Sequence, residues 1–253
     1  MSRGHQPVDA VIFDWGGTLT PWHEVDLPQQ WRVYAREVHG LPLDTTQMPP
    51  EDLAEADSLA LRIHAAEEQA WKRGRHTHES ASIAAILAEA GVDPAHVRHH
   101  LALAAYRRFW EPHTHTDPQV RPLWEGLRER GIRVGVLSNT IWPRSFHEAI
   151  FERDGVRHLI DGDVYTSEIR WTKPSPLAFA AALEAVGATD PARCVYVGDR
   201  LFDDIWGAQQ AGMRAVHVPH STIPSDQVGH TDGRPDATVH RIGEVLEVVA
   251  RWR

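Results

Sequence analysis

The stretch VDAVIFDWGGTL, residues 8–19, contains an apolar run followed by an aspartate, a tryptophan and two glycines. The run from Val8 to Phe13 is rich in β-branched residues and therefore indicates a buried strand. The pair Gly16 and Gly17 is typical of a tight turn. Asp14 stands between the two, so the sequence predicts a strand that places a carboxylate at the start of a loop.

Downstream of the proline-containing segment 111–118, apolar runs alternate with amphipathic stretches. The predicted strands are 132–138, 161–167, 193–199, 214–219 and 236–240, and the predicted helices are 119–131, 143–155, 176–187, 203–212 and a last one that ends at Arg253. Strands that alternate with helices form parallel sheets with right-handed crossovers. We expect an α/β fold with a doubly wound, mostly parallel sheet and helices on both faces. Residues 221–236 are expected to form a flexible loop.

Between these two regions the periodicity is helical throughout. Four helices are predicted, at 27–40, 49–74, 78–91 and 93–110, and no strand is evident among them. We therefore expect an α/β core formed by residues 1–22 and 113–253, into which residues 23–112 are inserted as an all-helical cap domain.

Composition excludes several classes of protein. The chain has 253 residues, of which 42% are hydrophobic and 24% charged, as in ordinary globular proteins. Its single cysteine, Cys194, rules out internal disulfides and a thiolate metal cage. A formal charge of −9 argues against nucleic acid or a membrane surface as partner. No apolar run approaches the roughly 20 residues of a membrane span, and no secretory signal is evident, so a cytoplasmic location is expected.

Polar side chains follow four of the predicted strands. These loop motifs are Asp14 to Leu19, Ser138-Asn139, Lys173-Pro174, and Gly198-Asp199 with Asp203-Asp204. Each alone is compatible with a turn or a helix cap. All four in this order, with a cap-sized insertion after the first, resemble the haloacid dehalogenase superfamily of hydrolases. The resemblance covers nearly the whole chain and implies a Rossmann-like core with a helical cap between the first and second motifs.

The resemblance also implies a role for each motif residue. Asp14 corresponds to a nucleophile that forms an aspartyl-phosphate, and Ser138 and Lys173 to the other catalytic residues. A phosphoryl group needs donors and cations around its oxygens, which implies phosphate binding by Thr18, Ser138, Asn139 and Lys173. Magnesium prefers oxygen ligands, and the implied ligands are Asp14, the main-chain carbonyl of Gly16, Asp199 and, through the metal's water shell, Asp204.

Gly16 departs from the pattern of the superfamily. Its phosphatases usually carry a second aspartate two residues after the nucleophile, which protonates the leaving group and then activates water. A glycine keeps the main-chain carbonyl but removes this acid and base, a role typically worth about 10²–10⁴-fold in rate. One hypothesis is a magnesium-dependent phosphohydrolase of a small phosphorylated metabolite that uses good leaving groups or borrows an acid, for which His23 and Glu24 are candidates. We expect it to be a monomer or a homodimer.

Three alternatives stay open. A dehalogenase-like enzyme would cleave carbon–halogen bonds, although such enzymes work without metal and tend to lack the acidic motif GDRLFDD that is intact here. A phosphonatase-like enzyme would cleave a carbon–phosphorus bond and would need a cap lysine, for which Lys72 is the sole candidate. A protein that had lost turnover would bind phosphate or a protein partner.

Overall fold

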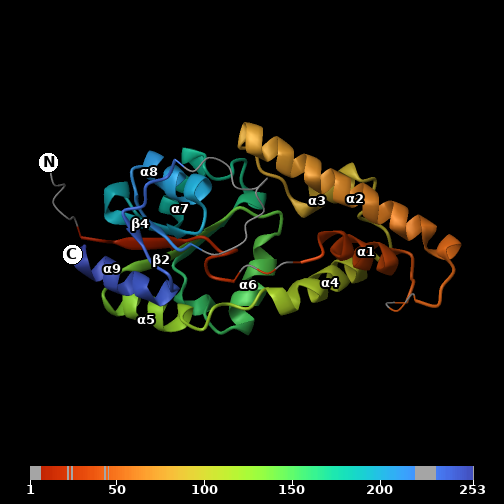
Figure 1. Ribbon diagram of the computed structural model, residues 1–253, viewed down its shortest axis with the longest axis horizontal. Helices are drawn as coiled ribbons and strands as arrows, with labels where there is room; N and C mark the ends of the chain where they lie inside the picture. Colours follow the sequence, from red (N-terminus) through yellow and green to blue (C-terminus); the bar gives the residue numbers. More distant parts are fainter. Residues whose placement is uncertain are drawn as a thin grey trace. The chain divides into compact units, whose positions relative to one another are not determined.

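The computed structural model describes residues 7–21, 23, 25–42, 44, 46–219 and 232–252. The chain forms two compact units (Figure 1). The core unit comprises Met1–Trp22, His78–Ser80 and His115–Arg253, and the helical unit comprises His23–Thr77 and Ala81–Thr114. This division differs from the expected ranges in assigning His78–Ser80 to the core unit and in ending the helical unit at Thr114. Glu24 and most of the expected flexible loop at 221–236 lie outside the described residues.

The core unit contains a six-stranded parallel sheet with the order β3-β2-β1-β4-β5-β6. Its strands are β1 (Ala10–Phe13), β2 (Arg133–Ser138), β3 (Gly162–Tyr165), β4 (Cys194–Gly198), β5 (Arg214–His217) and β6 (Ala237–Thr238). Phe13 pairs in register with Val136 of β2 and Val197 of β4, so the three strands end close to the same level. The predicted parallel α/β sheet is confirmed.

Helices cover both faces of this sheet. They are α5 (Val120–Glu129), α6 (Arg144–Arg153), α7 (Pro176–Ala185), α8 (Gly207–Gln210) and α9 (Val245–Arg251). Figure 1 shows α7 and α8 on one side and α5 and α9 on the other. Ile12 packs in the apolar cluster of α7, whereas the next residue, Phe13, lies against Trp124 of α5 with 5.9 Å between ring centroids. Alternation of side chains along β1 therefore feeds two hydrophobic layers.

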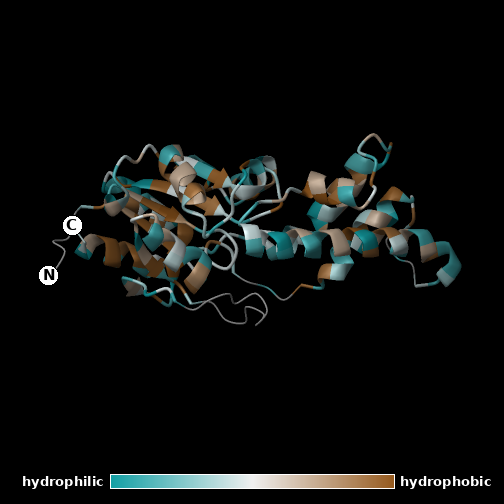
Figure 2. Cartoon of the chain, turned by 90° about the horizontal axis from the view of Figure 1, so that it is seen from above, coloured by the Kyte–Doolittle hydropathy of each residue, from teal (hydrophilic) through white to brown (hydrophobic). Residues whose placement is uncertain are grey.

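The helical unit contains α1 (Leu27–Val38), α2 (Pro50–Thr77), α3 (Ile83–Glu89) and α4 (His99–Trp110). Its centre is aromatic: Trp31 stacks on Tyr106 with 4.8 Å between ring centroids, and both are buried. The long helix α2 mixes hydrophilic and hydrophobic residues along its length (Figure 2). In the described part of the chain, no helix combines the length and the apolar character that a bilayer span requires.

Two predicted helix starts are wrong. The helix expected from 78 begins only at Ile83, because the Ser80 amide donates to the carbonyl of Arg170 at 2.9 Å and draws the preceding segment to the core unit. The helix expected from 93 begins only at His99, because the Asp93 carboxylate accepts the Ala95 amide at 2.8 Å and forms a local turn instead.

Candidate active site

The predicted site residues lie at the carboxyl ends of neighbouring strands in the core unit. Asp14 follows β1, Ser138 ends β2 and Asp199 follows β4. All three are buried, with 6%, 2% and 4% of their surface exposed. Parallel pairing with this register brings the three strand ends to the carboxyl edge of the sheet.

Lys173 connects the cluster. Its buried ammonium donates three hydrogen bonds: to Asp14 Oδ1 at 2.7 Å, to Asp204 Oδ1 at 2.7 Å and to Tyr196 Oη at 2.9 Å. An ammonium has three N–H donors, so each of them has a partner. Burial by itself lowers the pKa of Lys173, but the carboxylates of Asp14 and Asp204 outweigh it and hold this pKa well above its usual value. Lys173 is therefore a fixed positive charge.

The carboxylates crowd one another. Ligand oxygens of Asp14, Asp199 and Asp204 lie within 4.8 Å of one another. Burial raises the pKa of Asp14 to about 6, against the opposing effect of Lys173. The pKa of Asp199 is raised well above its usual value by burial, and then by repulsion from Asp204 and Asp14. Negative charge at this place is therefore incompletely compensated.

Asp199 provides the test of whether a metal ion fits. Both of its carboxylate oxygens are buried, and neither has a hydrogen-bond partner within the described ranges. Buried polar atoms are normally satisfied, so two carboxylate oxygens without a described donor, beside further acidic groups, fit the coordination of a cation. The donors are all hard oxygens, which suits Mg²⁺. The acidic cluster can hold a metal ion.

Two glycines allow the carboxylates to come this close. A Cβ on Gly17 would lie 2.6 Å from Asp199 Oδ2, and the residue has φ of +84°. A Cβ on Gly198 would lie 2.4 Å from the Asp204 carboxylate.

The predicted helix at 203–212 begins earlier, as a π-helix over Leu201–Trp206. In this turn Asp204 is completely buried and accepts the Arg200 amide at 2.9 Å, while Asp203 is partly exposed.

The second motif contributes a contact that the sequence did not predict. The side-chain amide of Asn139 binds the main chain of Lys173 twice, donating to its carbonyl at 3.1 Å and accepting its N–H at 2.8 Å. Asn139 thus anchors the loop that carries the lysine. The hydroxyl of Thr18 is buried, and no described group bonds to it, which leaves it available to a ligand.

Gly16 faces open space. A Cβ added to it would meet no described heavy atom within 4 Å, and its φ lies outside the left-handed range. The backbone and its surroundings therefore accept a side chain here, so no steric conflict with the described residues explains why this position is a glycine and not an aspartate.

Sequence reasoning missed Tyr196 and His217. The Tyr196 hydroxyl donates to the carbonyl of Leu137 at 2.9 Å while it accepts from Lys173. His217, at the end of β5, donates through Nε2 to the Asp199 carbonyl at 2.9 Å, since a carbonyl only accepts. The available signal was a polar residue inside or at the end of an otherwise apolar strand.

The other candidate groups lie in the helical unit. His23 is exposed, with its ring 5.7 Å from that of His113. Lys72 is half-exposed on α2, with Nζ 4.0 Å from a Glu68 carboxylate oxygen one turn earlier. Both stay predictions, as does the role of Glu24.

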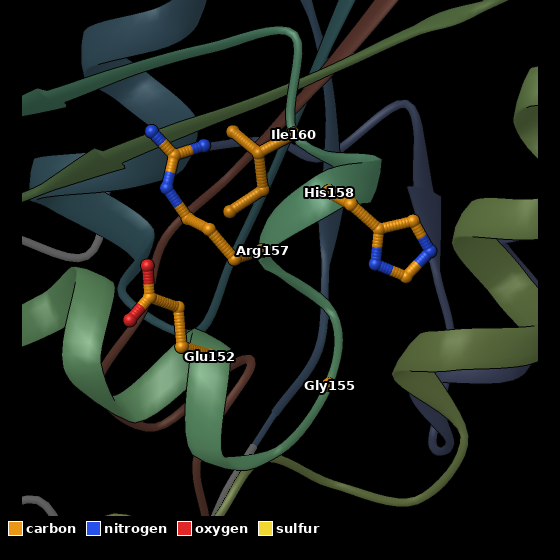
Figure 3. A pocket seen from close by; sticks show the side chains of 5 residues that line it. All are labelled: Glu152, Gly155, Arg157, His158 and Ile160. Atoms are coloured by element: carbon orange, nitrogen blue, oxygen red, sulfur yellow. The ribbon is translucent and has the colours of Figure 1, made fainter.

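A separate hollow of about 440 Å³ lies in the core unit, lined by Glu152, Gly155, Arg157, His158 and Ile160 (Figure 3). These residues lie in the last turn of α6 and in the segment that leads to the amino end of β3, whereas Asp14 follows the carboxyl end of β1. Arg157 is paired there with Glu148 at 2.9 Å. The hollow thus has no part in the carboxylate cluster.

Comparison with known proteins finds a matching family and similar relatives. Residues 8–212 match the model of the haloacid dehalogenase-like hydrolases. A glyceraldehyde 3-phosphate phosphatase from Methanopyrus kandleri is 28% identical over 242 residues, which cover 96% of this chain and 97% of the relative. A second one, from Methanothermobacter thermautotrophicus, is 38% identical over 125 residues, 49% of this chain and 54% of that protein.

Solved structures show the same fold. A HAD phosphatase from Thermococcus onnurineus superposes with a TM-score of 0.62 at 20% identity, over 96% of this chain and 98% of the other. A 2-haloacid dehalogenase from Pseudomonas syringae pv. tomato DC3000 superposes with a TM-score of 0.61 at 24% identity, over 97% of this chain and 100% of the other.

Proposed function

We propose that this chain, which belongs to the haloacid dehalogenase-like hydrolases, is a Mg²⁺-dependent phosphohydrolase that acts on a small phosphorylated metabolite through an aspartyl-phosphate at Asp14. One observation carries the proposal: Lys173 is held between Asp14 and Asp204, beside an Asp199 carboxylate whose oxygens have no described partner. Relatives named as glyceraldehyde 3-phosphate phosphatases support a small phosphorylated substrate.

The proposed reaction has two displacements. A carboxylate oxygen of Asp14 attacks phosphorus, and the bond from phosphorus to the leaving oxygen breaks with its electron pair on that oxygen. Water then attacks the same phosphorus, the bond to Asp14 breaks, and inorganic phosphate leaves. The hydroxyls of Ser138 and Thr18 and the main-chain amide of Asn139 would donate to the phosphoryl oxygens, and Lys173 would supply fixed positive charge.

The residues that would hold Mg²⁺ are Asp14, Asp199 and the main-chain carbonyl of Gly16. Asp204 would contact the ion through its water shell. When bound, the ion neutralises the negative charge of these carboxylates and of the phosphoryl oxygens. The carboxylate crowding described above supports this assignment, because Asp14, Asp199 and Asp204 repel one another and bound positive charge would offset that repulsion.

Gly16 narrows the chemistry of the leaving group. With no carboxylate at this position, the leaving oxygen departs without a proton from the nucleophile loop. Acyl and aryl phosphates, whose leaving groups are stable anions, should therefore react faster than alkyl phosphates.

The test is turnover of a panel of acyl, aryl and sugar phosphates, phosphonoacetaldehyde and 2-haloacids, with Mg²⁺ or with EDTA. Asp14→Asn is compared with Asp9→Asn, a control whose carboxylate pairs with Arg193 at 2.6 Å outside the cluster. Phosphate release that requires both metal and Asp14 supports the proposal. Metal-independent halide release, or cleavage of the phosphonate alone, would replace it with one of the alternatives. Binding of orthovanadate without any turnover would indicate a binding protein.

A further inference from the structure

The side chain of Tyr196 links two strands that are not neighbours in the sheet. It lies on β4, is completely buried, and its ring contacts Phe179 edge-on with 5.1 Å between centroids. Its hydroxyl nevertheless reaches the carbonyl of Leu137 on β2, although β1 lies between these two strands. The side chain therefore spans β1 just below the level of Asp14 and ties together the strands that carry the second and fourth motifs.

The direction of the hydrogen bonds follows from chemistry. A carbonyl oxygen only accepts, so the Tyr196 hydroxyl must use its one hydrogen on Leu137. Its lone pairs are then left for the Lys173 ammonium, 2.9 Å away. The ammonium only donates, and the arrangement has a single consistent assignment.

The third hydrogen bond locates the lysine. Asp14 and Asp204 take two of the three ammonium hydrogens, and these two bonds of 2.7 Å set the position of the ammonium between the carboxylates but not its displacement away from the line that joins them. The neutral Tyr196 oxygen, held by a strand carbonyl, fixes the third direction. Without it, one buried N–H of a charged group would lack an acceptor, a situation that buried groups relieve by moving.

We propose that Tyr196 is a positioning residue, which fixes the Lys173 ammonium between the nucleophile Asp14 and the metal-site residue Asp204. The Leu137 carbonyl, one residue before Ser138, sets the orientation of its hydroxyl. Through Tyr196, the position of the Lys173 ammonium depends on β2, the strand that ends in the predicted phosphate-binding residue Ser138.

The sequence makes a direct test possible, because the chain has only two lysines, Lys72 and Lys173. In protein with ¹⁵N-labelled lysine, the ammonium signals are two, and Lys72→Arg assigns them. Lys72 is about half-exposed, whereas Lys173 is buried and its ammonium hydrogens should exchange slowly with water. In Tyr196→Phe we expect the Lys173 signal to shift and its hydrogens to exchange at least about tenfold faster.

The matched control is Tyr165→Phe. Tyr165 is an equally buried tyrosine on β3 whose hydroxyl donates to Asp163 at 3.0 Å and has no bond to Lys173. The two variants lose the same atom and a buried hydrogen bond, but only Tyr196→Phe should change the ammonium signal. An unchanged signal in Tyr196→Phe, or equal changes in both variants, would overturn the proposal and leave Tyr196 as a packing residue.

A second arm uses turnover and rests on the proposed function. We expect kcat of Tyr196→Phe to fall roughly tenfold with KM changed less than about twofold, because a displaced lysine weakens the transition state more than substrate binding. Tyr165→Phe should keep both constants within about twofold. A Tyr196→Phe enzyme that matches Tyr165→Phe in kcat would count against the proposal.

Two outcomes need separate readouts. If no substrate is turned over by the wild-type chain, the proposed function fails, and the ammonium signal still decides the role of Tyr196. If Tyr196→Phe does not fold, the wild-type chain is grown with 3-fluorotyrosine, whose hydroxyl is a weaker acceptor. The Lys173 ammonium should then shift, and an unchanged signal would reject the contact.

Discussion

Both units of this chain contain a carboxylate whose pKa is raised chiefly by burial, and the surroundings of the two carboxylates differ. In the helical unit, Glu67 accepts the Trp31 indole N–H at 2.7 Å and the Gln30 amide at 3.1 Å on one oxygen. Gln30 is in turn bonded by the Trp110 indole at 3.0 Å. Burial raises the pKa of Glu67 to about 7, while its donors oppose the shift. This carboxyl is surrounded by neutral N–H groups and lies in a satisfied network.

In the core unit, Asp14, Asp199 and Asp204 face one another around a single ammonium, and Asp199 has two buried oxygens that no described donor reaches. Burial raises carboxylate pKa values in both units, so the pKa alone does not distinguish them. What distinguishes the core cluster is crowding of like charge around acceptor oxygens that have no described donor, and a bound cation relieves both.

The largest expected effect comes from removing the cation of the core cluster. Lys173→Met leaves buried carboxylates without their ammonium, and we expect phosphatase kcat/KM to fall at least about 10³-fold. The free energy of unfolding should fall by about 3 kcal/mol. Lys72→Met, the matched change at the other lysine, should stay within about 0.5 kcal/mol. Kinetics and urea unfolding measure both, and equal effects in the two variants would contradict the assignment.

Restoring an acid at the open position is the next largest effect. Gly16→Asp should raise kcat toward alkyl phosphates by about 10²-fold and change turnover of aryl phosphates much less. Gly16→Asn has the same size without the acid and should show no gain. A plot of rate against leaving-group pKa for both variants checks this, and a gain in Gly16→Asn would mean that shape rather than proton transfer is responsible.

Metal binding should depend on the carboxylates of the core unit and not on Glu67 of the helical unit. Mg²⁺ at about 100 times its dissociation constant should stabilise the chain by about 2.7 kcal/mol, and EDTA should remove the gain. Asp199→Asn should abolish this stabilisation, whereas Glu67→Gln should leave it intact. Thermal melts with and without Mg²⁺ measure both, and a metal effect that survives in Asp199→Asn would move the site elsewhere.

The smallest effect concerns pH and Glu67. Because the folded-state pKa is raised, to about 7 from 4.5, folding favours the protonated form. This stabilising contribution is complete below pH 4.5 and is lost as the pH rises through 7. We expect a loss of about 1–2 kcal/mol between pH 5 and 8 in urea unfolding, given the partial exposure of the side chain.

Glu67→Gln keeps an acceptor for the Trp31 indole and should flatten that pH dependence. Its neighbour Glu68, whose side chain is 55% exposed, supplies the control, and Glu68→Gln should retain the wild-type profile. A profile that is equally steep in both variants would assign the pH dependence to other groups.

Much of the fold was predictable because its signals are local. The central strands β1, β2 and β4 are short, mainly apolar runs, and the change from helical periodicity to strand–helix alternation is visible without any contact between distant residues. One wrong helix start has a distant cause: the Ser80 amide bonds to the carbonyl of Arg170, ninety positions away. The other has a local cause that helical periodicity does not register, the turn in which the Asp93 carboxylate accepts the Ala95 amide.

The candidate site shows the same division. The loops of Asp14, Ser138 and Asp199 could be identified because each polar residue comes at the end of an apolar run, whereas Lys173 was identified by its lysine–proline pair and its order among the motifs. A tyrosine within an apolar strand is visible in the sequence, but the contacts of Tyr196 could not be predicted. Its partners Leu137 and Lys173 lie 59 and 23 positions away, and nothing in the local sequence points to them. The same holds for His217, whose role depends on the carbonyl of Asp199 in the neighbouring strand's loop.

The class of sheet, the helical insertion and the charged residues of the motif loops could be read from the sequence, since apolar periodicity and residue type are local properties. How those charges are compensated depends on the folded chain. The tertiary structure left Asp199 without a described donor, gave every Lys173 hydrogen an acceptor and left room beside Gly16. The physical reason is that burial and hydrogen-bond geometry depend on which strands become neighbours, and that is a property of the folded chain as a whole.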